Sequence, residues 1–444
     1  MVGINLNYSE ACKYLDKTLV FGIKPNLLRI NKILELLGNP HKKVEFIHIA
    51  GTNGKTSTTK ITAAILNSHN YKAGYYISPH VHSYTERISI KGRDISSDDF
   101  AAVLQEILPL VEKVNEFNLD GEMTQFEILT AMMFYAVIRE KLDVMVLEAG
   151  MGGRWDATNA AYAGTAGLTG VSLEHTQILG KTIASITKEK AEIIKGRCRV
   201  ATSSTDPTVL KILEEKCAKT GSELFEIGKA FEVKSVKKDS IEGFTADIKG
   251  IYDVYKKIMF PIPGDYQKTN LCLAIALSEL FTYDKLNVQK INQGIACTNI
   301  SGRFQLMRTS PVFIADASHN PEGIKNFASN IMKYFKKNKK IIIFSVLKDK
   351  EYKEMIKAIL PVADIMILTS SYSARSLDIN LLEEAVIKES QNLNKIGMKS
   401  PKSIYRIDNI ANSIKFSLDI ALKNDIICLT GSITNLEFVK SEYF

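Results

Sequence analysis

Apolar and polar residues follow two periods along this chain, one typical of strands and one typical of helices. Short apolar runs bounded by turn-forming residues predict buried strands, and longer stretches with apolar residues every three or four positions predict helices. In the first half we expect strands at 44–50, 74–78, 143–148, 165–171 and 198–202. Between them we expect helices, among others at 58–69, 98–117 and 124–140. Strands that alternate with helices in this way predict a mainly parallel sheet covered by helices on both faces.

The rest of the chain divides into two further patterns. The segment 223–260 alternates at period two, which predicts hairpins at one edge of the sheet. A helix begins near 264, and the small and turn-forming residues of "CTNISGRF" (297–304) precede a new series of strands and helices. The strands of this second series are expected at 312–316, 340–345, 365–369, 403–406 and 425–430. We therefore predict two domains, residues 1–297 and residues 298–444, because the second part is long enough for its own core.

Length and composition agree with two globular domains. The chain has 444 residues, of which 45% are apolar and 24% charged, and about 150 residues per domain allows two or three domains. Its six cysteines are far apart and form no Cys-x-x-Cys pair, which argues against a zinc module and against a disulfide framework. No stretch approaches about 20 uninterrupted apolar residues, and the first residues lack the layout of a signal peptide. We expect a cytoplasmic protein that does not bind a membrane.

The net charge of +8 raises the question of a nucleic-acid partner. Lysines and acidic residues are interleaved along the chain, as in "KDKEYKEMIK" (348–357). The densest basic cluster lies at 336–340, directly before the apolar run "IIIFSVL", which is typical of the solvated end of a helix that leads into a strand. We therefore predict no nucleic-acid partner. A surplus of positive charge also suits small polyanionic ligands.

The strand at 44–50 leads into "GTNGKTS" (51–57), which is a shortened form of a phosphate-binding loop. The common form has a glycine five residues before the Gly-Lys pair, and here that position is Ile49. Phosphate oxygens need backbone N–H donors and a positive helix end, and glycines let the backbone curl closely enough to offer them. Gly51 and Gly54 bracket the turn in the way that this geometry needs.

Three polar side chains follow at the expected start of the helix. Lys55 can reach the terminal phosphates of a nucleotide, and Thr56 or Ser57 offers a hydroxyl near a metal ion. An ordinary strand-to-helix turn with an exposed lysine explains the same residues. The chemistry at the other strand ends favours the phosphate site.

Further polar residues lie where neighbouring strands are expected to end. Ser78, Glu148 and the pair Glu174-His175 each follow or close a predicted strand. Ligands of open α/β sheets bind at the carboxyl ends of the strands, so these side chains are expected to converge on the phosphate loop. Hard oxygen ligands with one imidazole suit Mg²⁺ beside a triphosphate. Taken singly, each residue also has an ordinary explanation, as a turn residue, a surface ion pair or a helix cap.

Lys190 lies in "SITKEKAEIIK" (185–195), among further lysines and glutamates. This pattern is typical of the solvated face of a helix. From the residues alone we therefore predict an exposed Lys190 without a function in the site.

Taken together, the motifs of this chain resemble those of the folylpolyglutamate synthases, some of which are also dihydrofolate synthases, in the superfamily of the muramyl-peptide ligases. The resemblance covers nearly the whole chain and rests on motifs in this order: "GTNGK", "SPHVHSYTERI", "GEMTQFEILTAM", "LEAGMGGRWDATN", "LEHT", "KEKAEIIK", "SGRF", "DASHNPEG" and "FSVLKDKEY". It implies an α/β fold with an N-terminal P-loop ATPase domain, mainly parallel in its sheet, and a smaller C-terminal Rossmann-like α/β domain. Such proteins use the shortened loop as an ATP site. This chain departs from the family at Thr56, where glycine is common.

The resemblance also implies roles for individual residues. ATP would contact Asn53, Gly54, Lys55, Thr56, Ser57, Asn270, Arg303 and Asp316. Two Mg²⁺ ions would be held by Ser78, Glu148, His175 and Lys190, the last as a carbamylated lysine, which replaces the prediction of a solvated Lys190. A folate or pteroate site would be built from Phe126, Glu127, Trp155, Asp156 and Ala157. Catalysis would involve Lys55, Lys190 and His319.

The activity that the resemblance implies is an ATP-dependent ligation of L-glutamate to a folate or to dihydropteroate by a monomeric enzyme. The γ-phosphoryl group of ATP would activate the acceptor carboxylate as an acyl phosphate, which the amine of glutamate attacks. Three alternatives remain from the residues. A cell-wall amide ligase would carry a further N-terminal domain, for which the roughly 45 residues before the loop are too few. A P-loop switch or motor would hydrolyse ATP without an amino acid, and a non-catalytic folate-binding protein would not need Lys55, Glu148 and His175 together.

Overall fold

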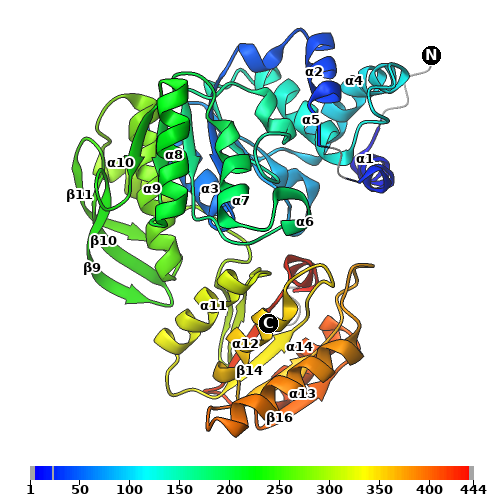
Figure 1. Cartoon of the computed structure of the whole chain (residues 1–444), viewed down its shortest axis with the longest axis vertical. Helices are drawn as coiled ribbons and strands as arrows, with labels where there is room; N and C mark the ends of the chain where they lie inside the picture. Colours follow the sequence, from blue (N-terminus) through cyan, green and yellow to red (C-terminus); the bar gives the residue numbers. More distant parts are fainter. Residues whose placement is uncertain (1–5, 23–24, 440–444) are drawn as a thin grey trace. The chain divides into compact units, whose positions relative to one another are not determined.

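The computed structural model describes residues 6–22 and 25–439 of the chain. These residues form two compact units. The first unit comprises the chain up to residue 237 together with 245–260 and 267–298, and the second comprises 238–244, 261–266 and the chain from 299 onward. The boundary between residues 297 and 298 stays a prediction. Each unit has its own sheet and its own core (Figure 1).

An eight-stranded sheet forms the centre of the first unit, in the order β4-β3-β2-β5-β1-β6-β7-β8. The strands from β2 to β8 in this order run parallel, while β3 and β4 add an antiparallel edge beside β2. The prediction of a mainly parallel sheet is therefore confirmed. The strands are β1 (Glu45–Ala50), β2 (Ala73–Tyr76), β3 (Ile88–Ile90), β4 (Arg93–Asp94), β5 (Val144–Glu148), β6 (Thr165–Leu168), β7 (Arg199–Thr202) and β8 (Glu223–Glu226).

Helices cover both faces of this sheet. On one face, α3 packs against β1, β2 and β5 and against α10. On the other, α1, α2, α4 and α5 form a core with Phe46, Met145 and Leu147 of the central strands. The α-helices of this region are α1 (Tyr8–Lys17), α2 (Leu28–Leu36), α3 (Lys55–Ser68), α4 (Ser97–Glu116), α5 (Gln125–Arg139), α6 (Thr176–Leu179), α7 (Ile183–Lys190), α8 (Pro207–Thr220), α9 (Asp265–Thr282) and α10 (Val288–Ala296). The helices expected at 58–69, 98–117 and 124–140 correspond to α3, α4 and α5.

The prediction of hairpins for 223–260 at one edge of the large sheet was wrong in part. β8 extends the large sheet by pairing parallel with β7. A separate three-stranded sheet follows, made of β9 (Glu232–Ser240), β10 (Gly243–Lys249) and β11 (Val254–Phe260). β11 of this small sheet packs against α10.

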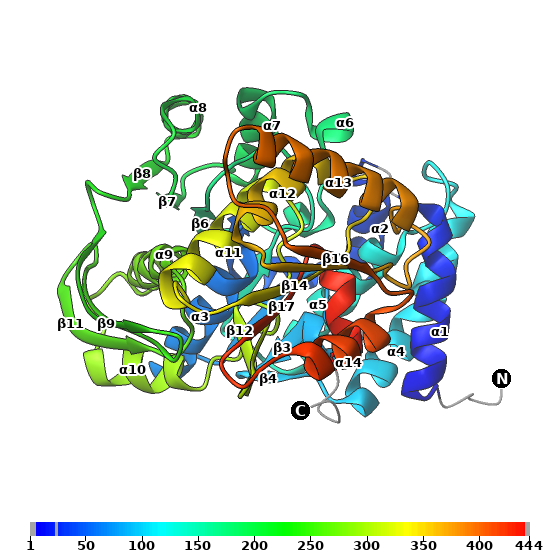
Figure 2. The same cartoon turned by 90° about the horizontal axis from the view of Figure 1, so that it is seen from below.

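The second unit contains a six-stranded sheet in the order β12-β13-β17-β14-β15-β16. α11, α12 and α13 lie in a row on one face and α14 lies on the other (Figure 2). The strands are β12 (Gln305–Thr309), β13 (Val312–Ala315), β14 (Lys340–Phe344), β15 (Ile365–Leu368), β16 (Ser403–Arg406) and β17 (Ile426–Thr430), and the helices are α11 (Pro321–Tyr334), α12 (Tyr352–Ile359), α13 (Ile379–Lys395) and α14 (Ile410–Ile420). The five strands expected here are present. β12, which pairs antiparallel with β13, was not predicted.

The sequence argued against disulfide bonds and against membrane-spanning segments. All six cysteines are free thiols, and Cys198, Cys217, Cys272 and Cys428 are buried. Within residues 6–22 and 25–439, no helix has the length and apolarity that a bilayer crossing needs.

Candidate active site

The turn after β1 has a backbone that only glycine adopts without strain. Gly51 has a φ of +148°, and a Cβ there would lie 1.7 Å from Thr169 Oγ1. Gly54 has a φ of +89°, and its Cβ would lie 2.4 Å from Asn270 Oδ1. Both positions combine a backbone that favours glycine with a close neighbour. The chain therefore curls tightly around the start of α3, with Asn270 of α9 beside it.

The first turn of α3 is open to an anion. Gly54 precedes the helix, and no side chain of the described residues caps the N-terminus. The free N–H groups and the positive end of the helix dipole therefore face the loop. Lys55 Nζ folds back and donates to Thr52 O at 3.0 Å, and the buried Ser57 Oγ has no hydrogen-bond partner among the described residues. Phosphate oxygens fit such a set of donors.

Glu148 lies against this turn. It is the last residue of β5, which pairs with β1 so that Glu148 is opposite Ile49. The side chain is only 2% exposed, and Thr56 Oγ1 donates to its two carboxylate oxygens at 2.9 and 3.1 Å. Thr56, where glycine is common in the family that this chain resembles, thus contacts the predicted metal ligand. Ser78 follows β2, which is the next strand in the sheet beyond β5.

Lys190 is buried, so the prediction from residues alone that it lies on a solvated helix face was wrong. It is the last residue of α7, is 3% exposed, and Nζ donates to Gly51 O at 2.7 Å. Burial and the nearby charge of Lys55 lower its pKa to about 7. The neighbouring residue Glu189, by contrast, forms an ion pair with Arg154. Lys190 itself turns inward to the phosphate loop.

The residues at these strand ends supply few protein ligands for a metal ion. His175 directly precedes α6 with a φ of +50°, and its Nε2 lies 3.7 Å from Glu174 Oε1. No group of three or more His, Cys, Asp or Glu side chains in the described part of the chain is arranged to hold a metal. Mg²⁺ at nucleotide sites needs only one or two carboxylates, because phosphates and water complete its octahedron. Glu148, with Ser57 in the first turn of α3 and Ser78 after the neighbouring strand β2, fits that requirement.

A cavity of about 460 Å³ adjoins this edge of the sheet. All five residues predicted to bind folate line it: Phe126, Glu127, Trp155, Asp156 and Ala157. Phe126 and Glu127 begin α5, and the other three belong to the loop after β5. Gly150 brings this loop close to Phe126, since a Cβ there would lie 2.7 Å from the ring. Ser78 also lines the cavity, so the cavity and the metal-ligand candidates share one side of the unit.

Glu127 has one carboxylate oxygen occupied and one free. Oε2 accepts from Arg29 Nε at 3.0 Å and from the backbone N–H of Thr124 at 2.8 Å. Arg29 is completely buried and also donates to Leu119 O and Asp120 O. Oε1 is buried and has no partner among the described residues. The carboxylate is thus fixed on one side and presents an unused acceptor on the other.

Asp156 holds the loop after β5 in shape. Its Oδ2 accepts from the N–H of Met151 at 2.8 Å and its Oδ1 accepts from the N–H of Thr158 at 3.0 Å. Burial raises the pKa of this carboxyl group above its usual range. Thr158 in turn contacts the buried His48, at 2.9 Å from Nε2. Glu127 and Asp156, two of the five residues predicted to bind folate, therefore also form hydrogen bonds that hold the surrounding chain in place.

Several lining residues were missed from the sequence, namely Gly22, Pro25, Asn26, Pro79, Thr124, Ile178, Leu179 and Glu189. One signal was present for Thr124, because "TQFE" (124–127) has the spacing of a capping box, which the structure contains. Five of these residues follow no sequence pattern that relates them to α5, namely Gly22, Pro25, Asn26, Ile178 and Leu179. Their place at the cavity is a product of tertiary packing.

In the second unit, Asp316 follows β13 and is 2% exposed. Its oxygens accept from the N–H groups of Phe304 at 2.8 Å and Ser318 at 2.9 Å. Burial raises its pKa, while the charge of Arg303 acts in the opposite direction. His319 Nδ1 contacts Ala317 O at 2.9 Å. The structure thus groups Arg303, Asp316 and His319 in one unit, and groups Asn270 with Asn53, Lys55 and the rest of the phosphate loop in the other.

Both units match families of known proteins. Residues 49–278 match the Mur ligase middle domain, and residues 302–433 match the Mur ligase, glutamate ligase domain. The fold and the phosphate loop therefore define a Mur-type ligase. A dihydrofolate synthase/folylpolyglutamate synthase of Mycobacterium tuberculosis is 35% identical over 81% of this chain and 77% of its own length, and its Bacillus subtilis counterpart is 30% identical over 96% of both. The crystal structure of the M. tuberculosis folylpolyglutamate synthase complexed with ADP and AMPPCP has a TM-score of 0.89 at 31% identity, covering 98% of this chain and 99% of that one.

This chain belongs to the dihydrofolate synthase/folylpolyglutamate synthase family within the Mur ligases. The family and the fold class predicted from the motifs are confirmed. Two members of this group have been crystallised with ligands that bear on the site: the M. tuberculosis synthase with ADP, and a folylpolyglutamate synthase with AMPPCP and folate.

Proposed function

We propose that this protein is an ATP-dependent ligase that adds L-glutamate to the γ-carboxylate of a reduced folate. One observation carries the proposal. The loop after β5 connects a carboxylate at the phosphate-binding turn, Glu148, with a cavity of about 460 Å³ that begins two residues later at Gly150. An activating nucleotide and an aromatic acid would therefore be bound by neighbouring parts of one unit.

The chain's own residues would position and neutralise the nucleotide. A carboxylate does not condense with an amine at neutral pH, because its oxygen is a poor leaving group, and transfer of the γ-phosphoryl group of ATP gives an acyl phosphate. Such a transfer depends mainly on positioning and on charge neutralisation. Lys55, now bonded to Thr52 O, would turn to the β- and γ-phosphates, and the N–H groups from Gly54 to Ser57 would hold them. Mg²⁺, when bound near Glu148, Ser78 and His175, would screen the triphosphate charge.

Lys190 would serve as a carbamylated lysine. A carbamate forms when a neutral amine attacks CO₂ and releases a proton, so a lysine must lose its charge first. With a pKa of about 7, a large fraction of Lys190 is neutral at physiological pH. The modification replaces a cation beside Lys55 with an anion, which would favour a second Mg²⁺ at this point.

The folate would occupy the cavity at the start of α5. Phe126 and the half-exposed ring of Trp155 offer apolar faces for a flat heterocycle. The free Oε1 of Glu127 would accept from the N–H groups of the pteridine, because Arg29 already fixes the other oxygen. Asp156 and Ala157 would contribute by holding the loop that closes the cavity.

The second domain, residues 298–444, would complete the site by closing over it. We propose that Arg303, Asp316 and His319 contact the nucleotide and the acyl phosphate in the closed form, which would exclude water. The amine of L-glutamate would then attack the acyl carbon and release phosphate. Small-angle scattering tests the closure: the protein should contract when ATP, folate and Mg²⁺ are added, and an unchanged radius of gyration would contradict it.

A coupled assay of ADP release tests the whole proposal. ADP release should require L-glutamate and a folate acceptor together, with tetrahydrofolate and dihydropteroate offered in separate reactions. Activity with dihydropteroate is the second candidate function, favoured because the similar proteins of M. tuberculosis and B. subtilis carry both names. ATP hydrolysis without glutamate would instead indicate a switch or motor, and activity on a nucleotide-linked peptide a cell-wall ligase. A monomeric state, a cytoplasmic location and the absence of a nucleic-acid partner stay predictions.

A further inference from the structure

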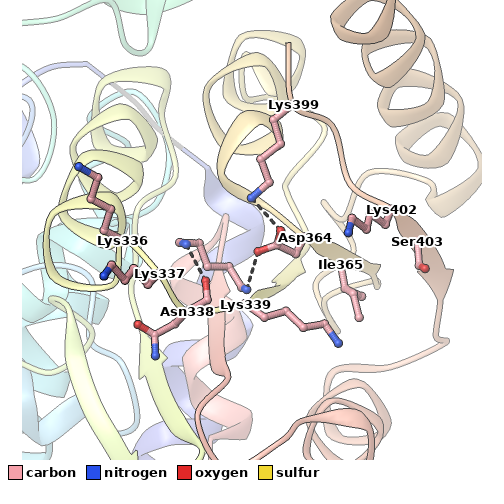
Figure 3. Close-up of a pocket in the computed structure, with 10 residues that line it drawn as sticks. Lys336, Lys337, Asn338, Lys339, Asp364, Ile365, Lys399, Lys402 and Ser403 are labelled. Carbon is pink, nitrogen blue, oxygen red and sulfur yellow. Dashed lines mark hydrogen bonds and ion pairs between the residues drawn. The ribbon is translucent and has the colours of Figure 1, made fainter. Parts of the chain in front are cut away.

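A basic cavity of about 510 Å³ opens in the second unit at the amino ends of β14, β15 and β16 (Figure 3). Six lysines and one carboxylate, Asp364, are among the residues that line it; the lysines are Lys336, Lys337, Lys339, Lys340, Lys399 and Lys402. Asp316 follows β13, which runs parallel to these strands, so it lies at the opposite edge of the same sheet. The cavity is therefore separate from the site described above.

The acidic groups near the cavity neutralise only part of this charge. Lys399 Nζ lies 2.8 Å from Asp364 Oδ1, and the backbone N–H of Lys340 donates to Asp364 Oδ2 at 2.9 Å. Lys339 lies 3.9 Å from Asp425, at the limit of an ion pair. Two carboxylates therefore face six ammonium groups, which leaves an excess of positive charge in the cavity.

The remaining lysines at the rim have no acidic partner. Lys336, Lys337 and Lys402 are exposed and form no ion pair with any described residue. They come from two separate segments, the turn after α11 and the stretch before β16, and both segments border the cavity (Figure 3). Lysines elsewhere are often paired, as Lys237 is with Asp247 at 2.6 Å. This cluster departs from the mixed charge pattern of the rest of the chain.

Lys340 makes the floor of the cavity unusual. It is 2% exposed, and one of its three N–H groups donates to Asn338 O at 2.7 Å. The other two have no acceptor among the described residues. Burial and the charge of Lys399 lower its pKa. A buried cation beside other lysines is costly, Asp364 offsets part of this cost, and an anion in the cavity would offset more of it.

We propose that this cavity binds a small anion with two or more carboxylate or phosphate groups. Lysine ammonium groups are compact point charges without the fixed fork of arginine, so they accept both kinds of group. Several lysines spread around the rim favour more than one negative charge in the ligand. The volume is within the range of small-molecule sites, and a concave shape favours such a ligand over a flat protein surface. The proposal stands independently of the ligase activity.

Calorimetric titration of the full chain tests this site with two probes, inorganic pyrophosphate and tri-γ-glutamate, and with acetate as a monovalent control. A triple variant should weaken at least one probe about tenfold, which corresponds to about 1.4 kcal/mol; its substitutions are Lys336→Gln, Lys337→Gln and Lys402→Gln. A matched triple variant of exposed lysines outside the cavity should change affinity less than twofold; its substitutions are Lys211→Gln, Lys219→Gln and Lys285→Gln. The probe that binds identifies phosphate or carboxylate as the recognised group.

Both probes also suit the proposed nucleotide and folate sites, so Lys55→Ala is measured alongside. The binding assigned to the cavity is the component that the cavity triple variant loses and Lys55→Ala retains. Equal weakening in both triple variants would indicate unspecific charge attraction and overturn the proposal. So would the absence of a cavity component, or tighter binding of an acidic peptide than of either probe, which would assign the surface to a protein partner.

Discussion

Each unit of this protein contains an almost fully buried lysine beside a second lysine. In the first unit Lys190 lies near Lys55, and in the second Lys340 lies near Lys399. In both cases burial and the neighbouring cation lower the pKa of the buried amine. The shared electrostatics would suggest a shared function, but the surroundings differ.

Lys190 contacts the backbone of the phosphate loop, and Lys340 lines a cavity together with further lysines. Lys190 donates to Gly51 O, in a turn whose glycines pack closely against their neighbours. Lys340 donates to Asn338 O beside the exposed Lys337 and Lys339. The first arrangement suits one transition state, which needs fixed groups. The second suits loose capture of an anion, which needs only charge.

The largest expected difference between the two lysine pairs is the effect of a substitution on kcat. Lys55→Ala should lower kcat on the order of 10²-fold or more, because it removes a group that neutralises the transferring phosphoryl group. Lys399→Ala, which removes the corresponding neighbour in the second unit, should change kcat less than twofold. Steady-state rates of ADP release measure both. Similar losses in the two variants would remove the distinction between the regions.

Lys190→Ala should also lower kcat strongly, and added acetate should restore part of the activity. A short carboxylate can enter the space of the lost carbamate and replace its charge. The measurement is the rate against acetate concentration, with Lys340→Ala as the matched control in which acetate has no effect. If acetate did not restore activity to a folded Lys190→Ala protein, this result would argue against a carbamate at Lys190.

A smaller effect is expected in thermal stability as a function of pH. The pKa of Lys190 is about 7 in the folded state and near 10.5 in an ordinary lysine. Between these values the unfolded chain binds the extra proton, so stability rises as pH increases from about 7 to about 10. Lys190→Met should remove the share of this rise that Lys190 contributes, which we expect to be about 5 °C in Tm. Scans in CO₂-free buffer compare the variant with the wild type, and parallel curves would contradict the burial of a neutral amine.

Most of the first site could be predicted because its determinants are local. Gly51, Gly54 and Lys55 lie within one turn, and the loop geometry follows from their spacing. Glu148 and Ser78 were predicted from strand ends, since parallel strands place their carboxyl ends on one edge. The same rule applies to any sheet of this kind and needs no knowledge of the packing.

The rest depends on contacts between distant parts of the chain. Arg29 fixes Glu127 although 98 positions separate them. The residue pattern around Lys190 indicated exposure, because the acceptor Gly51 O lies 139 positions away. The cluster at 336–340 was visible as charge, but the cavity was not, because its other wall comes from 399–403. Such pairings are set by tertiary packing, which periodicity does not describe.

The smallest expected effect concerns the one carboxylate that lines the basic cavity. Asp364→Asn removes a negative charge and leaves Lys399 without its partner, so the affinity for the recognised anion should increase about threefold, on the scale of one exposed ion pair. Asp425→Asn is the matched control, since Asp425 lies only at the margin, 3.9 Å from Lys339. Its effect should be smaller than that of Asp364→Asn.

The pKa of Asp364 is lowered by its bond to Lys399 against the effect of burial, so its stabilising contribution is present at neutral pH and is lost on acidification. Asp364→Asn should therefore reduce Tm slightly at pH 7 while it strengthens anion binding, and a variant that weakened both would show that Asp364 organises the cavity instead of opposing the ligand.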